Sequence, residues 1–394
     1  MKRIFVAFVL VMAWLFTAAA QDAVCDTSVY FVNVYPGGDI YELEGHSAIL
    51  VDIPGREPVA YNFGVFDFEA PNFVYRFVKG ETDYRAVAWP WRPFVMPYIA
   101  AGRRVVARKL NFDSAQTARL VALLETNVLP ENAVYRYNYV KDNCATRPLR
   151  AVELAAGDTL QLGPALIEAD SYTEPTFRNV MRRYHRNYPW YQFGIDLALG
   201  SGIDYRLSRR ELAFAPAELD GMLAGAVAGG NRLVSETKVV ADFAPDNAVA
   251  APTPWFLRPE TVFGALLLLA ICLTVRDVRR RKVTRWFDAV FFGVVGVTGL
   301  VLTFLIFVSE HEATSPNLLY VWVNPLNLLV PALLWIKSAK KVLVCYQIVN
   351  FALLLILLCC WPFASQSGNP AFLPIAATGL IRSFSYVYIS LTGK

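Results

Sequence analysis

The sequence is poor in histidine and cysteine, because its 394 residues include only three histidines and six cysteines. The histidines lie far apart, at positions 46, 185 and 311, and this scatter gives no ligand pattern for a zinc site, so we expect no metal and no other cofactor. Internal repeats and a glycine-rich phosphate loop are also missing, which excludes repeat architectures and P-loop nucleotide binding. The net charge is only +4, and most of the surplus belongs to two short basic loops, so we expect no nucleic-acid partner.

Long uncharged runs, in contrast, are abundant in the last third of the chain. They cover residues 261–275, 289–309, 313–336 and 342–381, and the last run is long enough for two passes with a turn near residues 364–370. Because a membrane helix needs about 20 apolar residues, these runs predict a membrane domain of about five transmembrane helices. We expect Asn324 and Asn327 to form hydrogen bonds between these helices.

Basic residues indicate the orientation of this domain, because they follow only the first and third runs, at 276–285 and 337–341. The positive-inside rule then places these loops in the cytoplasm and the preceding globular domain outside it. Residues 1–20 have the pattern of a cleaved signal peptide, with an uncleaved anchor helix as the alternative. We therefore predict a multi-pass protein of the bacterial inner (cytoplasmic) membrane with a periplasmic domain, since outer membranes hold barrels.

The predicted domains are a signal peptide at 1–20, a periplasmic domain at 21–245, a linker at 246–258 and the membrane domain at 259–394. Residues 28–110 alternate apolar and polar side chains and predict antiparallel strands, with a hairpin closed at residues 54–57. Asp113 or Ser114 starts a predicted helix that runs to about residue 128. A second helix should begin near Asn143, whereas residues 155–250 have little clean periodicity.

Only two cysteines, Cys25 and Cys144, lie in the outward part of the chain, because the other four fall in apolar runs where a thiol is a small hydrophobe. One interpretation is a structural disulfide between them. The other makes Cys144 a nucleophile. If Asn143 caps a helix, the thiol lies in its first turn, where free N–H groups favour a thiolate.

A nucleophilic thiol needs a base, and only His46 and His185 are available in the outward domain. His46 begins a predicted hairpin strand, and Asn62 on the returning strand is best placed to orient its imidazole. His185 lies among arginines and tyrosine, so we expect it to belong to a surface or headgroup-facing basic patch. These residues favour a His46–Cys144 dyad.

Several motifs resemble a known family, the Lnb-type bacterial lipoprotein N-acyltransferases. "EGHSAILVDI", "YNFGVFDFEAPNFVYRFVKGETDY" and "YNYVKDNCATRPLR" resemble its periplasmic domain, and "SEHEATSPNLLYVWVNPLNLL" resembles its membrane half. The order of histidine before cysteine is also similar to lecithin:retinol acyltransferase and to permuted NlpC-like papain folds. The resemblance implies an α+β, permuted papain-like (NlpC-like) outer domain followed by an all-α membrane domain.

The resemblance implies that Cys144 is the nucleophile and His46 the general base and acid, and the position of Asn62 makes it the expected orienting group. Four further residues of the cysteine motif are expected to support the site or its oxyanion: Tyr139, Asp142, Asn143 and Arg147. In the membrane half, Arg382 and His311 are candidate lipid contacts. The alternatives for Arg382 are snorkelling to the interface or a structural pair with a polar residue of another span. The alternative for His311 is a solvated loop residue without a role.

The implied activity is acyl transfer from a phospholipid donor, through a cysteine thioester, to the N-terminal amine of a lipoprotein acceptor at the membrane. Two alternatives remain open from the residues. One is a papain-like cysteine peptidase or amidase that acts on peptidoglycan or envelope peptides, and the other is a non-catalytic envelope scaffold with Cys144 bonded to Cys25.

Overall fold

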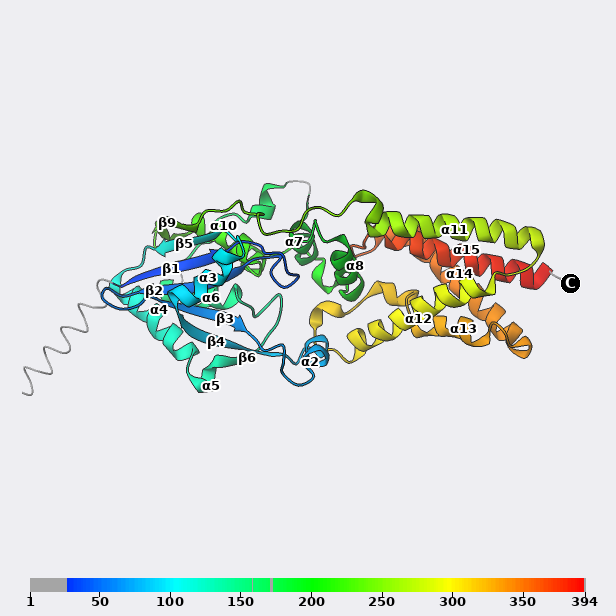
Figure 1. Cartoon of the computed structure of the whole chain (residues 1–394), viewed down its shortest axis with the longest axis horizontal. Coiled ribbons are helices and arrows are strands. Elements are labelled where there is room, and N and C mark those ends of the chain that lie inside the picture. Colours follow the sequence, from blue (N-terminus) through cyan, green and yellow to red (C-terminus); the bar gives the residue numbers. More distant parts are fainter. Residues whose placement is uncertain (1–26, 158, 171–172, 393–394) are drawn as a thin grey trace, which may run out of the picture. The chain divides into compact units, whose positions relative to one another are not determined.

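The computed structural model describes residues 27–157, 159–170 and 173–392 (Figure 1). The expected signal peptide and Cys25 lie outside these residues. The described chain forms two compact units. Unit 1 comprises the described residues up to Phe77 together with Glu81–Pro175 and Arg206–Ala250, and unit 2 comprises Val78–Gly80, Thr176–Tyr205 and the chain from Ala251 onward.

Unit 1 is built on a seven-stranded antiparallel sheet with the order β6-β4-β3-β2-β1-β5-β9. The strands are β1 (Ser28–Val34), β2 (His46–Asp52), β3 (Val59–Val65), β4 (Asp83–Pro90), β5 (Val105–Leu110), β6 (Val134–Arg136) and β9 (Val234–Ala241). The predicted hairpin is confirmed, because β2 pairs with β3 and Ala48 lies opposite Asn62. A separate ribbon joins β7 (Val227–Ala228) to β8 (Asn231–Arg232).

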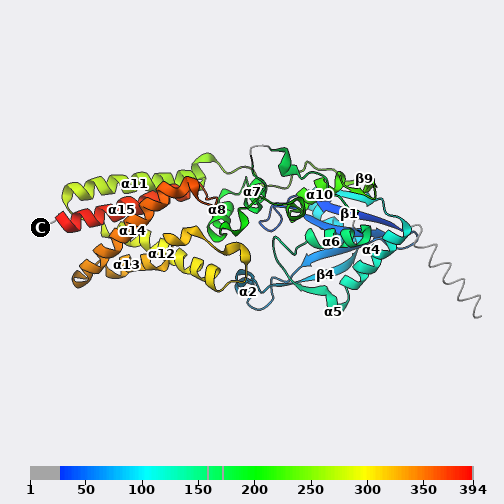
Figure 2. The ribbon, with the colours of Figure 1, turned by 180° about the vertical axis from the view of Figure 1, so that it is seen from behind.

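The alternation of side chains along the strands gives the sheet two buried faces. Tyr30, Val32 and Val34 pack with Phe94 and Val95 of α3 (Trp91–Ala100), which covers one face. The predicted helix at 114–127 is confirmed as α4 (Ser114–Asn127), and Asp113 closes its capping box with Gln116. Figures 1 and 2 show the sheet and the helices around it from opposite sides.

The remaining helices of unit 1 are short. They are α5 (Pro130–Ala133), α6 (Thr146–Ala156), η1 (Leu166–Ala169), α9 (Arg209–Leu212) and α10 (Pro216–Ala224), and α2 (Phe73–Lys79) joins the two units. The inward side of α6 is apolar, with Leu149 and Val152 fully buried, and α6 contacts β2 and α4. This packing fixes the residues that precede α6 against the sheet.

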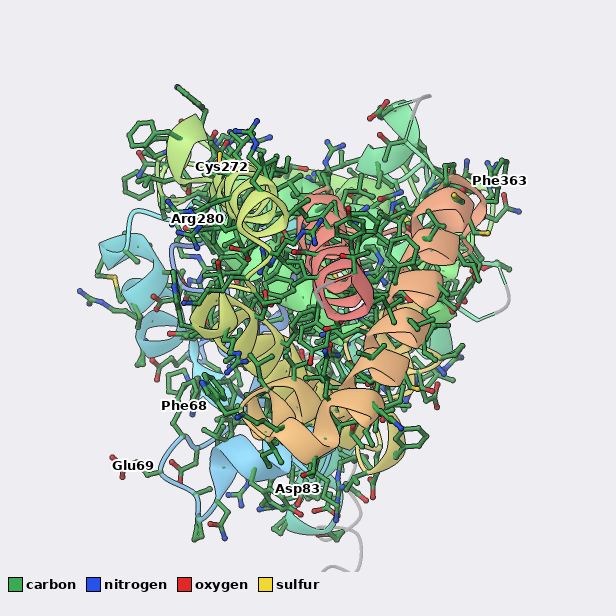
Figure 3. The ribbon with its side chains drawn as sticks, turned by 90° about the vertical axis from the view of Figure 1, so that its right-hand side faces the viewer. Phe68, Glu69, Asp83, Cys272, Arg280 and Phe363 are labelled. Carbon is green, nitrogen blue, oxygen red and sulfur yellow. The ribbon has the colours of Figure 1, made fainter. Side chains whose placement is uncertain are left out.

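Unit 2 contains four described helices that are long and apolar enough to cross a membrane. They are α11 (Pro259–Arg280), α12 (Arg285–Phe307), α14 (Lys340–Cys360), which 3-10 turns at Lys337–Ala339 (η7) and Trp361–Phe363 (η8) extend, and α15 (Phe372–Thr392). Cys272 and Arg280 lie on α11, and Phe363 follows α14 (Figure 3). The expected count of five spans is not confirmed.

The difference lies in the third expected span, residues 313–336, which is broken into short pieces. These are η4 (Glu312–Thr314), η5 (Leu318–Val321), η6 (Pro325–Leu328) and α13 (Leu329–Leu333). Prolines at 316, 325 and 331 interrupt a regular helix because they lack an N–H donor. Asn324 and Asn327 form hydrogen bonds with backbone groups of this same segment, so their expected role between helices is wrong.

Two glycines of α12 allow the broken segment to approach closely. A Cβ atom at Gly299 would lie 2.3 Å from the carbonyl carbon of Asn324, and one at Gly296 would lie 2.7 Å from Cγ of Leu328. Real Cβ atoms do not approach other atoms this closely. The segment therefore packs with its backbone against α12.

Residues Thr176–Tyr205 belong to unit 2 although they precede its main helices by many residues. They form α7 (Phe177–Tyr184), α8 (Pro189–Ala198) and η2 (Ser201–Ile203), and η3 (Trp255–Leu257) precedes α11. Arg178 is fully buried and its guanidinium pairs with Asp196 at 2.9 Å and Asp204 at 2.7 Å. His185 is also buried and bonds Gln192 Oε1 through Nδ1 at 2.7 Å, so the expected headgroup-facing patch is wrong here.

Candidate functional site

His46 and Asn62 lie on adjacent strands at the same face of the sheet. His46 begins β2, and its Nε2 lies 2.7 Å from Oδ1 of Asn62 on β3. An amide oxygen only accepts hydrogen bonds, so Nε2 carries the proton and Nδ1 keeps a free lone pair. This pairing gives His46 the tautomer that a base requires at Nδ1.

The surroundings of His46 keep its ring neutral. Burial lowers the pKa of His46 to about 4, the hydrogen bond with Asn62 works against this shift, and the nearby charge of Arg103 works with it. The ring of Tyr98 on α3 stacks on the imidazole with 6.1 Å between ring centroids. At neutral pH His46 is therefore ready to accept a proton.

Cys144 lies in a loop that Asn143 holds in place. Oδ1 of Asn143 accepts hydrogen bonds from the backbone N–H groups of Ala145 (2.8 Å) and Thr146 (3.0 Å). Its Nδ2 donates to the carbonyl oxygens of Tyr139 (2.7 Å) and Phe214 (2.9 Å). The expected cap at Asn143 is wrong, because α6 begins at Thr146 and its N-cap is Ala145, which has no side-chain cap hydrogen bond. Cys144 therefore precedes the helix instead of lying in its first turn.

The loop carries Cys144 to the ends of the strands that hold His46 and Asn62. Ser47, the neighbour of His46, donates a hydrogen bond from Oγ to the carbonyl oxygen of Cys144 at 2.6 Å. On β3, a Cβ atom at Gly64 would lie 3.5 Å from Cβ of Cys144, and the φ of Gly64 is +99°. The distance allows ordinary van der Waals contact, so it is the positive φ that favours glycine at this position.

The environment of Cys144 favours the neutral thiol, contrary to the expected thiolate. Burial raises the pKa of Cys144 to about 12, and the carboxylate of Glu44 adds to this shift. The backbone N–H of Ser47, the N–H of Cys144 itself and the charge of Arg103 work against it. The expected effect of a helix start is absent because Cys144 lies before the first turn. Among the described residues, which do not include Cys25, Cys144 has no disulfide partner.

Other residues of the cysteine motif brace the loop. Asp142 and Arg147 form a two-pronged ion pair with both distances at 2.8 Å, and the guanidinium of Arg147 lies 3.4 Å from the centroid of the Tyr135 ring. Tyr139 donates a short hydrogen bond to Glu44, two residues before His46. These contacts tie the cysteine loop to the strand that begins with His46.

Arg103 is a residue of the site that the sequence did not reveal. It is buried, and its Nε donates to the carbonyl of Tyr35 at 2.8 Å while Nη1 pairs with Glu42 at 2.5 Å. Its Nη2 has no hydrogen-bond partner among the residues that the structure describes, and the charge of Arg103 acts on both Cys144 and His46. Glu42 and Glu44 were visible in "ELEGHS", at alternate positions before the histidine, whereas Arg103 has no comparable local signal.

The two candidate lipid contacts of the membrane half, Arg382 and His311, lie in different surroundings. Arg382 on α15 is fully buried and pairs with Asp277 at 2.9 Å and Asp288 at 2.6 Å. Of the two alternatives for this residue, the structure contains the structural pair with polar residues of other helices, here two aspartates. His311 is partly exposed in the loop after α12, and its lipid contact stays a prediction.

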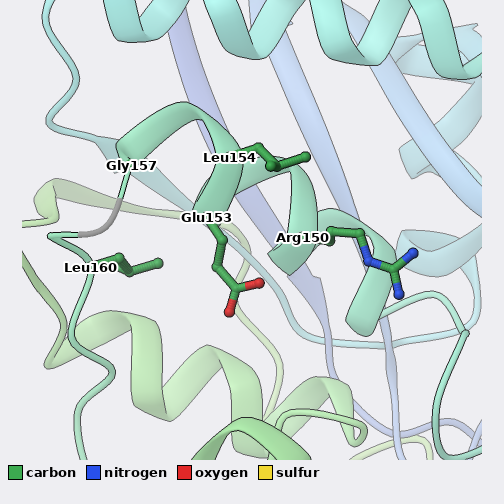
Figure 4. Close-up of a pocket in the computed structure, with 5 residues that line it drawn as sticks. All are labelled: Arg150, Glu153, Leu154, Gly157 and Leu160. Atoms are coloured by element: carbon green, nitrogen blue, oxygen red, sulfur yellow. The ribbon is translucent and has the colours of Figure 1, made fainter.

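Metal-binding groups and surface pockets are two further kinds of candidate site. Among the residues that the structure describes, no three His, Cys, Asp or Glu side chains are grouped to hold a metal ion. A surface pocket of about 310 Å³ lies along α6 and is lined by Arg150, Glu153, Leu154, Gly157 and Leu160 (Figure 4). Its residues follow Cys144 by at least one helical turn, so we assign it no role in the chemistry.

Comparison with known proteins agrees with this division of the chain. Residues 16–182 match the Lnb N-terminal periplasmic domain, and residues 251–394 match the Lnb transmembrane domain. No curated protein and no solved structure matches the chain. The protein is thus a membrane protein with a periplasmic amino-terminal α/β domain and a helical membrane domain. The chain belongs to the Lnb family.

Proposed function

We propose that this chain is a cysteine-dependent acyltransferase of the bacterial inner membrane. It carries a fatty acyl group from a phospholipid, through a thioester on Cys144, to the N-terminal amine of a lipoprotein. The hydrogen bond from Ser47 to Cys144 carries the proposal, because it holds the thiol loop beside the His46–Asn62 pair. Membership of the Lnb family supports a membrane-bound enzyme, and unit 1 would be a permuted papain-like domain in the periplasm.

The first half-reaction forms the acyl-enzyme. Nδ1 of His46 accepts the thiol proton, and the sulfur of Cys144 attacks the carbonyl carbon of a phospholipid ester. The tetrahedral intermediate then breaks its bond to the glycerol oxygen. This oxygen takes the proton from His46 and leaves as the hydroxyl of a lysophospholipid, while the acyl group remains on sulfur.

The second half-reaction forms the amide. The neutral α-amine of the lipoprotein attacks the thioester carbonyl, and His46 accepts a proton from the attacking nitrogen. The carbon–sulfur bond then breaks, and the cysteine sulfur recovers its proton from His46. The enzyme returns to its starting state with one acyl chain moved from an ester to an amide.

The pKa values of Cys144 and His46 determine the protonation states from which the first half-reaction starts. Because the pKa of Cys144 is raised to about 12 and that of His46 is lowered to about 4, the resting pair is thiol and neutral imidazole. Proton transfer then accompanies attack on the ester, so a thiolate is not exposed to solvent between turnovers. The N–H groups of Ser47 and Cys144, which lower the pKa of the thiol, are the candidate oxyanion donors.

Acylation of a reporter lipoprotein in cells without any other N-acylating enzyme tests the proposal. We expect the wild type to acylate the reporter, with a loss of about 10³-fold or more for Cys144→Ser and His46→Ala, as for other nucleophile and base variants. Cys272→Ser, which changes an exposed thiol on α11, is the matched control and should acylate normally. Equal acylation by all variants would exclude the dyad.

The mass of the intact protein separates transfer from its alternatives. After incubation with phospholipid, wild-type protein should gain one acyl chain on Cys144, and hydroxylamine should remove it. A peptidase or amidase would release peptide fragments from envelope peptides and gain no acyl chain. A scaffold would show a linked Cys25–Cys144 peptide without reduction.

A further inference from the structure

Five aromatic rings form a continuous cluster in unit 1, which we call the aromatic cluster: Tyr41, Phe66, Phe68, Phe73 and Phe77. Ring centroids lie 4.5 Å apart for Phe66 and Phe68, 5.1 Å for Phe68 and Phe73, and 5.9 Å for Tyr41 and Phe68. Phe73 and Phe77 stack at 6.1 Å along α2. The cluster thus joins the loop before β2, the end of β3 and the helix that follows it.

Much of this cluster faces solvent, which is unusual for large apolar side chains gathered in one place. Phe68 is 60% exposed and Tyr41 58%, and on α2 the neighbouring Val74 and Tyr75 are 73% and 54% exposed. No residue of α2 is buried. Figure 3 shows Phe68 and Glu69 on a projecting loop. A surface of this kind needs an apolar or interfacial partner.

The chain itself indicates which partner this is. The last residues of α2 contact the loop that follows the membrane helix α12: Ser309 donates from Oγ to the carbonyl of Val78 at 2.8 Å, and Glu310 N donates to the carbonyl of Lys79 at 2.7 Å. Since α12 ends at Phe307, these contacts lie within a few residues of a helix that is long enough to span a membrane. The aromatic cluster is therefore continuous, through α2, with a segment held next to the end of a membrane helix, and aromatic rings are preferred at lipid–water interfaces.

The inner end of the cluster continues to the cysteine site. Phe66 stacks on Tyr84 with centroids 4.8 Å apart, and Tyr84 stacks on Tyr137 at 4.0 Å. A Cβ atom at Gly64 would lie 3.9 Å from Tyr84 and 3.5 Å from Cβ of Cys144, so this glycine separates the tyrosine from the nucleophile. One wall of aromatic rings thus extends from exposed Phe68 to the vicinity of Cys144.

The charges near the cluster decide what kind of lipid surface it fits. Asp67 and Glu69 flank Phe68 and are exposed, while Arg76 of α2 is paired with Asp83 at 2.8 Å. Anionic lipids would gain little from such a surface. Zwitterionic headgroups tolerate both charge signs, and the rings supply the apolar contact.

We propose that the aromatic cluster inserts into the interface of a zwitterionic phospholipid leaflet and that its rings guide an acyl chain from this leaflet to Cys144. The first part needs only a membrane, whereas the second rests on the acyltransferase function proposed above. The occupant is a lipid, and a protein partner or a second copy of the chain is an alternative that the experiment separates.

Photo-crosslinking of the full chain in phosphatidylcholine vesicles tests the insertion. A benzophenone amino acid replaces Phe68 in one variant and Val239 in a matched control, since Val239 is 46% exposed on β9 at the other end of the sheet. We expect a phospholipid adduct at position 68, detected by intact mass, at a yield about tenfold above that at 239, because burial of a Phe side chain is worth a factor of at least this order. Replacing part of the phosphatidylcholine by phosphatidylglycerol should leave the yield unchanged.

A kinetic comparison tests the guiding role. In Phe68→Ser with Val74→Ser, acylation of Cys144 by bilayer phospholipid should slow about tenfold. Acylation by a short, water-soluble ester should keep its wild-type rate, which shows that the site is intact. Phe68 and Val74 touch no group of the dyad. A variant that had lost its fold would therefore be acylated more slowly by both donors.

The outcomes separate this inference from the proposed function. A lipid adduct at position 68 in a protein that never acylates Cys144 supports the insertion and overturns the acyltransferase. Normal acylation with equal adduct yields at 68 and 239 overturns the insertion and leaves the acyltransferase standing. Adducts at position 68 to another protein or to a second copy overturn the lipid as occupant.

Discussion

Three buried arginines are paired differently in the two units. In unit 2, every guanidinium nitrogen of Arg178 and Arg382 has a hydrogen-bond partner, and each of these residues pairs with two aspartates. In unit 1, Arg103 leaves Nη2 without a partner beside a cysteine and a histidine that are both held neutral. Complete pairing indicates a structural role, whereas an unused donor near neutral titratable groups indicates capacity for chemistry.

The largest effect is expected from breaking the complete pairing in the membrane half. Arg382→Leu leaves buried Asp288 without its counter-charge and Asp277 with only the half-exposed Arg276, and should lower the stability of unit 2 by about 3–5 kcal/mol. The retention of folded protein after heating in detergent, followed by size-exclusion chromatography, measures this loss.

The control for this variant is Arg276→Leu, whose side chain is 45% exposed and lies 3.4 Å from Asp277. A surface pair of this kind contributes less than about 1 kcal/mol, so the control should behave almost as the wild type. Equal losses in both variants would contradict the assignment of Arg382 as the central member of a buried network.

The second prediction concerns the neutral histidine of unit 1. Burial lowers the pKa of His46 from 6.5 to about 4, so the unfolded chain binds a proton that the folded chain does not. The resulting stability is fully present above pH 6.5 and is lost as the pH falls to about 4. It amounts to at most about 3 kcal/mol, reduced by solvent screening because His46 is partly exposed.

Urea unfolding of the wild type and of His46→Gln at several pH values measures this contribution. The wild type should lose stability toward acidic pH more steeply than the variant. Parallel curves would show that His46 is not held neutral by its surroundings.

The third prediction tests the unused donor of Arg103. Arg103→Gln removes a charge that lowers the pKa of His46 and of Cys144, so both pKa values should rise. The acid limb of the rate of Cys144 acylation should move to higher pH, and the maximal rate should fall about 10–100-fold if Nη2 contributes to charge stabilisation. Single-turnover acylation across pH measures both effects.

Arg103→Lys is the matched variant, because it keeps the positive charge but has no nitrogen in the place of Nη2. It should keep the acid limb near that of the wild type while the maximal rate still falls. An unchanged rate in both variants would make Arg103 a plain structural residue like Arg178.

The smallest effect is expected at Asn62. Its hydrogen bond raises the pKa of His46, so Asn62→Ala should move the acid limb to lower pH, opposite in sign to the change for Arg103→Gln. The rate should fall about tenfold because the ring loses its fixed tautomer and orientation. A shift in the same direction as for Arg103→Gln would contradict the proposed tautomer of His46.

Local patterns in the sequence were sufficient for the features that depend on neighbours along the chain. The Asp113 cap and the hairpin of β2 and β3 were predicted with their positions. The broken third span was missed although its three prolines are visible in the sequence, because hydropathy alone decided the prediction. Attention to proline spacing would have found it.

Features that depend on distant partners were not accessible in the same way. The neutral state of Cys144 follows from burial by residues far along the chain, which outweighs the nearby helix start. Arg103 reaches the site from two residues before β5, and the two aspartates that hold Arg382 precede it by about a hundred residues. Such partners are defined only once the chain has folded.

The two glycines on α12 affect which substitutions the membrane half can tolerate. Irregular backbone at membrane depth survives only where protein shields its polar groups from hydrocarbon. Gly296 and Gly299 let α12 provide that shield for the pieces between Pro325 and Leu333. Apolar replacements on the outward sides of α11 and α14 should thus be accepted freely, while even alanine at either glycine would push the shield away and admit acyl chains to bare carbonyls.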